Sequence, residues 1–376
     1  STSFYGNVVA FSESPLNENV LYAGTDDGLV HVTSDGGATW TKIESFPGVP
    51  LRTYVSRLEA SWHDPDGVYA AFDNHKNGDF KPYLLMSSDR GASWTSIAGD
   101  LPERDVVYAL AQDHVVADLL FAGTEFGAYF SRDHGQHWIE LTGGMPTIAV
   151  RDLEIQRRAN DLIAGTFGRG FYVLDDYTPL RAATEDVLAE PAHLFSARPA
   201  PLYIEGSRLG GRDGAGSQGS TYFTAPNPPF GAILTYHLAE KVTTRKERRK
   251  EAEKEARKAD ETPPYPDYEQ LRAEDTEETP VVLLTIRDDT GAVVRRVPAS
   301  RSKGMHRVAW DLRWPARSAV SGDSWSSRGN GPLALAGTYS ATLDQVVDGA
   351  TSQLAGPVSF TVVPLNLATL PAEDRA

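Results

Sequence analysis

The chain has 376 residues, a length that corresponds to two or three domains of ordinary size. Hydrophobic residues make up 40% and charged residues 23%, which excludes a wholly disordered or collagen-like chain. Cysteine is absent, so disulfide frameworks, thiolate metal sites and cysteine nucleophiles are excluded. The 36 basic and 51 acidic residues give a net charge of −15, which disfavours a nucleic-acid partner. No apolar run reaches the roughly 18 residues of a membrane span, and the abundant glycine and proline favour turn-rich β structure.

Three segments in the first half repeat one pattern, Ser/Thr-x-Asp-x-Gly-x-x-Trp. They are residues 33–40 (TSDGGATW), 87–94 (SSDRGASW) and 131–138 (SRDHGQHW). Their Asp residues lie 54 and 44 residues apart, close to the roughly 40–50 residues of a four-stranded propeller blade. An Ala-Gly-Thr string lies upstream of the first and third boxes and recurs at 164–166. That recurrence predicts a fourth, degenerate unit, so four blades are expected over about residues 7–181.

The pattern is typical of a tight turn. The short Asp side chain accepts backbone N–H bonds, Gly takes a left-handed conformation, and Trp packs back across the turn. We therefore expect the box residues to be structural. They are Asp35, Gly37, Trp40, Asp89, Gly91, Trp94, Asp133, Gly135, Trp138 and, in the degenerate unit, Asp175.

These boxes resemble the Asp-box, or BNR, repeats of β-propellers, a group that includes sialidases, xyloglucanase-type glycosidases, sortilin-type receptor domains and photosystem assembly factors. Residues 75–83 (HKNGDFKPY), 122–130 (AGTEFGAYF) and 166–180 (TFGRGFYVLDDYTPL) are similar to bacterial sortilin-like and glycosyl-hydrolase-like BNR-repeat proteins. The resemblance implies that the boxes lie at the outer edge of the propeller, away from the central axis where ligands bind. It also implies that the four blades are part of a larger propeller, and a periplasmic or extracellular location in a bacterium.

The second half has a different pattern. Residues 182–229 are rich in Pro and Gly and are expected to form a connector. Six strand-like runs over 230–365 predict an antiparallel sandwich. The strings GMHRVAWDLR (304–313) and AGTY (336–339) resemble the Ig-like domain of flagellar hook-capping proteins, with Trp310 and Tyr339 in the core.

A charged insertion at 239–279 interrupts the predicted sandwich. Its basic run, 241–258, predicts a solvated helix, and an acidic loop is expected to follow. Nucleic-acid binding by this run is disfavoured because no aromatic residues interleave it. Residues 366–376 look like the start of a further helix. The predicted fold class is therefore all-β: propeller blades, then an Ig-like or fibronectin-type sandwich with a helical insertion.

Polar residues in the strings that carry the resemblance are the ligand-binding candidates. Arg169, between two glycines, could be aimed at a carboxylate of a ligand or of the protein. The Asp- and Asn-rich stretch 63–79 could bind Ca²⁺, but it lacks EF-hand spacing and Asx-turns explain it. His134 and His137 are two ligands and do not make a metal site. The candidates are His75, Asp79, Lys81, Tyr83, Glu125 and Arg169.

The sequence favours a non-catalytic binding or assembly protein that recognises protein or glycan through its propeller faces. Its expected partners are another protein or further blades of the same precursor. The alternative is a glycoside hydrolase whose active site the missing blades complete. Such an enzyme needs two carboxylates about 5–9.5 Å apart, and sequence spacing cannot pair them. No phosphate loop, dinucleotide fingerprint or Ser-His-Asp signature is present.

Overall fold

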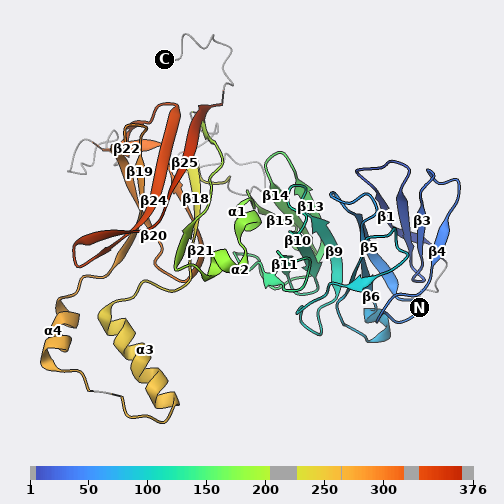
Figure 1. Cartoon of the computed structure of the whole chain (residues 1–376), viewed down its shortest axis with the longest axis horizontal. Coiled ribbons are helices and arrows are strands. Elements are labelled where there is room, and N and C mark those ends of the chain that lie inside the picture. Colours follow the sequence, from blue (N-terminus) through green and yellow to red (C-terminus); the bar gives the residue numbers. More distant parts are fainter. Residues whose placement is uncertain (1–5, 204–226, 264, 317–329, 366–376) are drawn as a thin grey trace, which may run out of the picture. The chain divides into compact units, whose positions relative to one another are not determined.

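The computed structural model describes residues 6–203, 227–263, 265–316 and 330–365 (Figure 1). Strands dominate and helices are few, which confirms the all-β prediction. The chain divides into two compact units, residues 1–184 and 185–376, called here the blade unit and the sandwich unit. None of the described helices is long and apolar enough to cross a membrane.

The blade unit consists of four antiparallel sheets whose strands follow one another in chain order. The first strand of each sheet lies beside the first strand of the next, so β1, β5, β9 and β13 form an inner row. Meandering sheets packed face to face around such a row are propeller blades. The strands are β1 (Val8–Glu13), β2 (Leu21–Thr25), β3 (Val30–Thr33) and β4 (Thr41–Ile43) in blade 1; β5 (Tyr54–Ala60), β6 (Val68–Asp73), β7 (Tyr83–Ser87) and β8 (Thr95–Ser96) in blade 2; β9 (Val107–Gln112), β10 (Leu120–Thr124), β11 (Ala128–Ser131) and β12 (Ile139–Glu140) in blade 3; and β13 (Val150–Gln156), β14 (Asp161–Thr166) and β15 (Phe171–Leu174) in blade 4.

Each Asp-box forms the turn between the third and fourth strands of its blade. In blade 1 the Thr33 hydroxyl donates to Asp35 Oδ1 (2.7 Å), and Asp35 accepts the Thr39 N–H (2.9 Å). The Trp40 indole N–H donates to the Gly37 carbonyl (3.1 Å), and Gly37 has φ 94°. The boxes of blades 2 and 3 repeat these bonds. The Asp carboxylate of each of these three boxes therefore accepts hydrogen bonds from its own turn.

Three apolar cores join the four blades, one at each junction. Leu58, Leu110 and Leu153 lie at the same register of the inner strands, and each is 1% exposed. Burial of a leucine side chain contributes about 1.5–3 kcal/mol. The same position thus stabilises each junction, as expected for a structure built from repeats.

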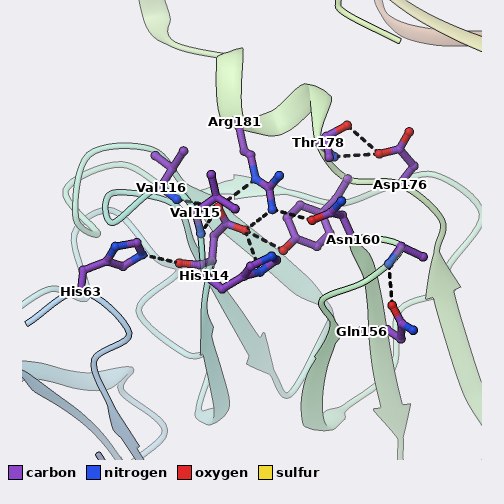
Figure 2. Close-up of polar contacts among 12 residues, drawn as sticks. His63, His114, Val115, Val116, Gln156, Asn160, Asp176, Thr178 and Arg181 are labelled. Atoms are coloured by element: carbon purple, nitrogen blue, oxygen red, sulfur yellow. Dashed lines mark hydrogen bonds and ion pairs between the residues drawn. The ribbon is translucent and has the colours of Figure 1, made fainter. Parts of the chain in front are cut away.

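A buried ion pair holds the end of blade 4 to blade 3 (Figure 2). Arg181, on the short helix α1 (Pro179–Ala182), donates to both carboxylate oxygens of Asp113 at 2.9 and 2.8 Å. Tyr177 donates to the same carboxylate at 2.6 Å, and the Val116 N–H donates at 2.8 Å. Burial by itself would raise the pKa of Asp113, but the hydrogen bonds from Arg181 and Tyr177 outweigh it and hold the pKa below its ordinary value.

The sandwich unit has two main sheets, β16-β18-β21 and β17-β25-β24-β19-β20, and a small β22-β23 sheet. Trp310 (0% exposed) and Tyr339 (7%) lie in its core with ring centroids 5.1 Å apart, which confirms the prediction for both. The unit begins with α2 (Glu185–Ala189), and its strands are β16 (Ala192–Leu194), β17 (Ala200–Leu202), β18 (Ala232–Leu238), β19 (Val281–Arg287), β20 (Val293–Ala299), β21 (Gly304–Trp310), β22 (Arg313–Pro315), β23 (Asn330–Leu333), β24 (Gly337–Val347) and β25 (Ala350–Pro364).

Two parts of the sequence prediction need correction here. Strands β16 and β17 lie inside the predicted connector, because Ala192, Leu194 and Ala200 find buried places in the sandwich core. The insertion holds the predicted helix, α3 (Arg245–Lys258), but the expected acidic loop contains a second one, α4 (Tyr268–Thr276). A capping box at Asp267 starts α4, and the Arg249–Glu274 ion pair (2.6 Å) joins it to α3. Residues 366–376 lie outside the described residues.

Candidate functional site

A cavity of about 520 Å³ lies in the blade unit at the end of the inner row where the strands begin. Blades 2, 3 and 4 all contribute to it. Its volume falls within the roughly 300–1,000 Å³ that is typical of small-molecule sites. The lining residues are His75, Phe80, Arg104, Val106, Tyr108, Glu125, Phe126 and Arg151.

A repeated β-bulge supplies two of these lining residues. Every inner strand has a register shift near its start, which leaves Val9, Ser56, Tyr108 and Arg151 as the extra residues. Bulges change the direction of a side chain and are common beside functional sites. In blades 3 and 4 the extra residues, Tyr108 and Arg151, both line the cavity.

Tyr108, Arg151 and Glu125 form one stacked, hydrogen-bonded group. The Arg151 guanidinium lies 3.7 Å from the centre of the Tyr108 ring and 3.8 Å from a Glu125 carboxylate oxygen. The Tyr108 hydroxyl donates to the same carboxylate. Burial, together with this hydrogen bond, raises the pKa of Tyr108, so its hydroxyl stays protonated at neutral pH. The group lines the cavity and holds one positive and one negative charge.

Arg104 also lines the cavity, and its guanidinium lies 5.4 Å from the centre of the Phe80 ring. No ion pair joins Arg104 to a carboxylate among the described residues. Phe80 is 38% and Phe126 50% exposed, so apolar ring surface is available at the rim. The cavity therefore offers a guanidinium free of a carboxylate partner beside exposed aromatic surface.

The fully buried Asp105 holds the β10–β11 turn, which contributes Glu125 and Phe126 to the cavity. Its carboxylate accepts the Thr124 hydroxyl (3.0 Å) and the Phe126 N–H (3.2 Å), both from the β10–β11 turn. Burial raises the pKa of Asp105 above its ordinary value. Asp105 thus positions Phe126 and, through the intervening turn, Glu125.

The structure brings together some of the residues predicted from sequence. His75, in the 3-10 turn η1 (His75–Asn77), lines the cavity with its ring bonded to Asp73 at 2.6 Å, and Glu125 lines it as well. Asp79 accepts bonds from Tyr83 (2.6 Å) and Asn74 (3.0 Å) in the same loop. Lys81 is exposed on that loop, and Arg169 is exposed in the β14–β15 turn; neither lines the cavity.

Sequence reasoning missed Arg104, Tyr108 and Arg151. A signal for the last two was present, since both follow a valine at the start of an inner strand, in Val107-Tyr108 and Val150-Arg151. Alignment of the repeats on the inner strands, rather than on the boxes, would have found them. Arg104 lies in an irregular segment and does not follow a valine at the start of an inner strand.

Polar side chains of residues 63–79 accept hydrogen bonds from backbone groups of the same stretch. Asp73 accepts the His75 N–H (3.0 Å), and Asp64 accepts the Asp66 N–H (3.0 Å), as in Asx-turns. Among the residues that the structure describes, no group of three or more His, Asp or Glu side chains is arranged to hold a metal ion. A Ca²⁺ site therefore has no geometric support in the described part of the chain.

A second cavity, of about 50 Å³, lies at the opposite end of the inner row and contains Glu59 and Glu154. Burial raises the pKa of Glu59 to about 7; Arg57, 3.4 Å away, opposes the shift and Glu154 adds to it. Arg57 also pairs with Asp152 (3.0 Å), and so links blade 2 to blade 4. Glu59 is therefore a partly protonated carboxyl group beside the inner strands.

The raised pKa of Glu59 gives a testable pH dependence. Between about pH 4.5 and 7 the folded chain holds a proton that the unfolded chain has released, so stability falls as pH rises through this window. We expect the wild type to lose stability on the order of 2 kcal/mol across this window, and Glu59→Gln to show no such loss. Urea unfolding at pH 5 and pH 8 measures it, with the exposed Glu44→Gln as control. Parallel pH profiles for Glu59→Gln and the wild type would contradict the assignment.

Comparison with known proteins gives partial likenesses. No family model matches the chain. A xyloglucanase of a Paenibacillus species is 27% identical over 146 residues, which are 36% of this chain and 14% of that enzyme. The chain thus spans about one seventh of the length of this relative.

Solved structures are likewise similar to only part of the chain. A GH74 enzyme of Niastella koreensis covers 46% of this chain and 29% of its own, at 14% identity and a TM-score of 0.37. YCF48 from Cyanidioschyzon merolae covers 46% and 55%, at 21% identity and a TM-score of 0.34. YCF48 bound to the D1 peptide covers 46% and 53%, at 14% identity and a TM-score of 0.36. The fold itself follows from the strand pairing described above.

Proposed function

We propose that the chain is a non-catalytic binding protein whose blade unit takes an acidic ligand, a protein segment or a glycan, in the 520 Å³ cavity. The observation that carries this is the pairing of Arg104, which has no carboxylate partner among the described residues, with the exposed rings of Phe80 and Phe126. A guanidinium binds a carboxylate with two parallel hydrogen bonds, and aromatic rings cover apolar surface next to it.

The second arginine supports the same class of ligand. Arg151 is held over Tyr108 and lies 3.8 Å from Glu125, so its position is fixed before a ligand arrives. With Arg104 and Arg151 against one Glu125, the fixed charge of the lining is positive although the chain as a whole is acidic. A bacterial cell envelope or extracellular location fits this role and belongs to the same proposal.

The proposal predicts that Arg104→Ala weakens the binding of a carboxylate-rich probe about tenfold or more, because a hydrogen bond to a charged group contributes about 1.5–3 kcal/mol. Isothermal titration calorimetry with polygalacturonate and with an acidic glutamate-rich peptide measures this and distinguishes a glycan from a protein ligand. Arg169→Ala, an exposed arginine outside the cavity, is the matched control. Binding of neither probe, or equal losses in both variants, would refute the proposal.

A glycoside hydrolase is the second candidate, and Glu59 is the specific observation in its favour. A general acid of a glycosidase needs a raised pKa and a second carboxylate nearby, as Glu59 and Glu154 provide. The cavity between them holds about 50 Å³, which is too small for a sugar ring. Release of reducing sugar from xyloglucan by this chain, and its loss in Glu59→Gln, would favour the hydrolase over the binding protein.

A further inference from the structure

A histidine and an aspartate form a closely bonded pair where β6 ends at the 520 Å³ cavity. Asp73 is the last residue of β6, and its side chain is 9% exposed. The His75 ring, which lines the cavity, donates from Nδ1 to the two oxygens of that carboxylate at 2.6 and 2.7 Å. An ionised carboxylate only accepts hydrogen bonds, so Nδ1 carries a proton and Nε2 lies on the edge of the ring away from Asp73.

The loop around this pair is held by its own hydrogen bonds. The His75 N–H donates to Asp73 Oδ1 at 3.0 Å, which fixes the backbone next to the ring. Asn74 is 5% exposed, accepts the side-chain amide of Asn77 at 2.7 Å and donates to Asp79 at 3.0 Å. The ring is therefore in place before a ligand binds, which lowers the cost of ordering it on binding.

The charge of the pair acts on other residues of the cavity. Burial and the hydrogen bond to Glu125 are the main causes that raise the pKa of Tyr108, and the charge of Asp73 adds to them. With the His75 ring protonated, the pair has no net charge. With the ring neutral, the Asp73 carboxylate is left uncompensated and opposes an acidic ligand.

Histidine is the side chain whose charge ordinarily changes between about pH 5 and 8. Arginine and lysine keep their charge in that range, and aspartate and glutamate ordinarily titrate below it. Burial raises the pKa of Tyr54 and that of Tyr108, so both hydroxyls stay protonated. The charged and titratable groups around His75 are Asp73 in β6, Lys76 in η1, Tyr54 in β5, Tyr108 in β9, Arg151 in β13, Glu125 in the β10–β11 turn, and Arg104.

We propose that His75 is a specificity-determining residue of the cavity, which makes the binding of acidic ligands depend on pH, and that Asp73 is its positioning residue. This inference rests on the proposed function. The protonated ring donates from Nε2 to a carboxylate of the ligand, whereas the neutral ring presents only a lone pair to it. Binding therefore takes up a proton, and the affinity rises as the pH falls from 8 to 5.5.

Isothermal titration calorimetry at pH 5.5, 6.5 and 8, with polygalacturonate and with the glutamate-rich peptide, tests the inference. We expect the full chain to bind about tenfold more tightly at pH 5.5 than at pH 8, since one hydrogen bond to a charged group is gained. His75→Gln removes the charge and His75→Lys keeps it at every pH, so both profiles should be flat, the first weak and the second tight. His134→Gln, at a histidine that is 45% exposed and does not line the cavity, is the control and should follow the wild type.

Asp73→Asn tests the positioning residue. Asparagine keeps an acceptor for Nδ1 but removes the charge that favours the imidazolium, so the rise in affinity should move to lower pH; circular dichroism verifies that each variant folds. Binding that depends on Arg104 but not on pH, or a pH profile that survives in His75→Gln, would overturn the inference and leave the proposed function standing. Binding of neither probe at any pH would refute the proposed function, and this inference with it.

Discussion

Replacing Arg181 with methionine is expected to destabilise the blade unit by about 3–5 kcal/mol, the usual cost of leaving one partner of a buried ion pair uncompensated. The Asp113 side chain is fully buried, and Arg181 supplies two of its hydrogen bonds. Methionine keeps the apolar length of the side chain but removes both bonds. The bond from Tyr177 remains and does not neutralise the carboxylate.

Urea unfolding of the variant at neutral pH measures this loss. The exposed pair Arg90–Asp66 (2.7 Å) provides a matched control, because Arg90→Met should cost less than about 1 kcal/mol. The double variant Asp113→Asn with Arg181→Met removes the stranded charge and should recover part of the stability. A loss in Arg181→Met no larger than that of the surface control would show that the pair does not anchor blade 4.

The blades could be predicted because the repeat places the same local chemistry at each turn. A Ser or Thr two residues before Asp, a Gly two residues after it and a Trp three residues later determine a turn within eight residues. The Asp113–Arg181 pair could not be predicted in this way, since its members are 68 residues apart and neither belongs to a repeated motif. The tertiary arrangement of blades 3 and 4 alone brings them together.

The candidate site shows the same limit. His75 and Glu125 lie in strings that carried the family resemblance, and both line the cavity. Arg151 lies outside those strings, and only an alignment of the repeats on their inner strands would place it, because its direction depends on the β-bulge near the start of the strand. Helix α4 was missed for a related reason: its capping box is local, but the ion pair to Arg249 that supports it comes from another helix.

Trp94→Ala is expected to destabilise the blade unit by about 3–5 kcal/mol, whereas Trp40→Ala at the same box position should cost less than about 1 kcal/mol. Both indoles donate to the Gly carbonyl three residues earlier in their own turns, so the bond within the box is common to both. The difference is the preceding blade: Phe46 packs against Trp94, while Trp40 is 43% exposed.

Urea unfolding of the two variants beside the wild type measures both losses, and circular dichroism verifies that each variant folds. Equal losses at the two positions would mean that packing within the box, and not the junction between blades, determines what the tryptophan contributes.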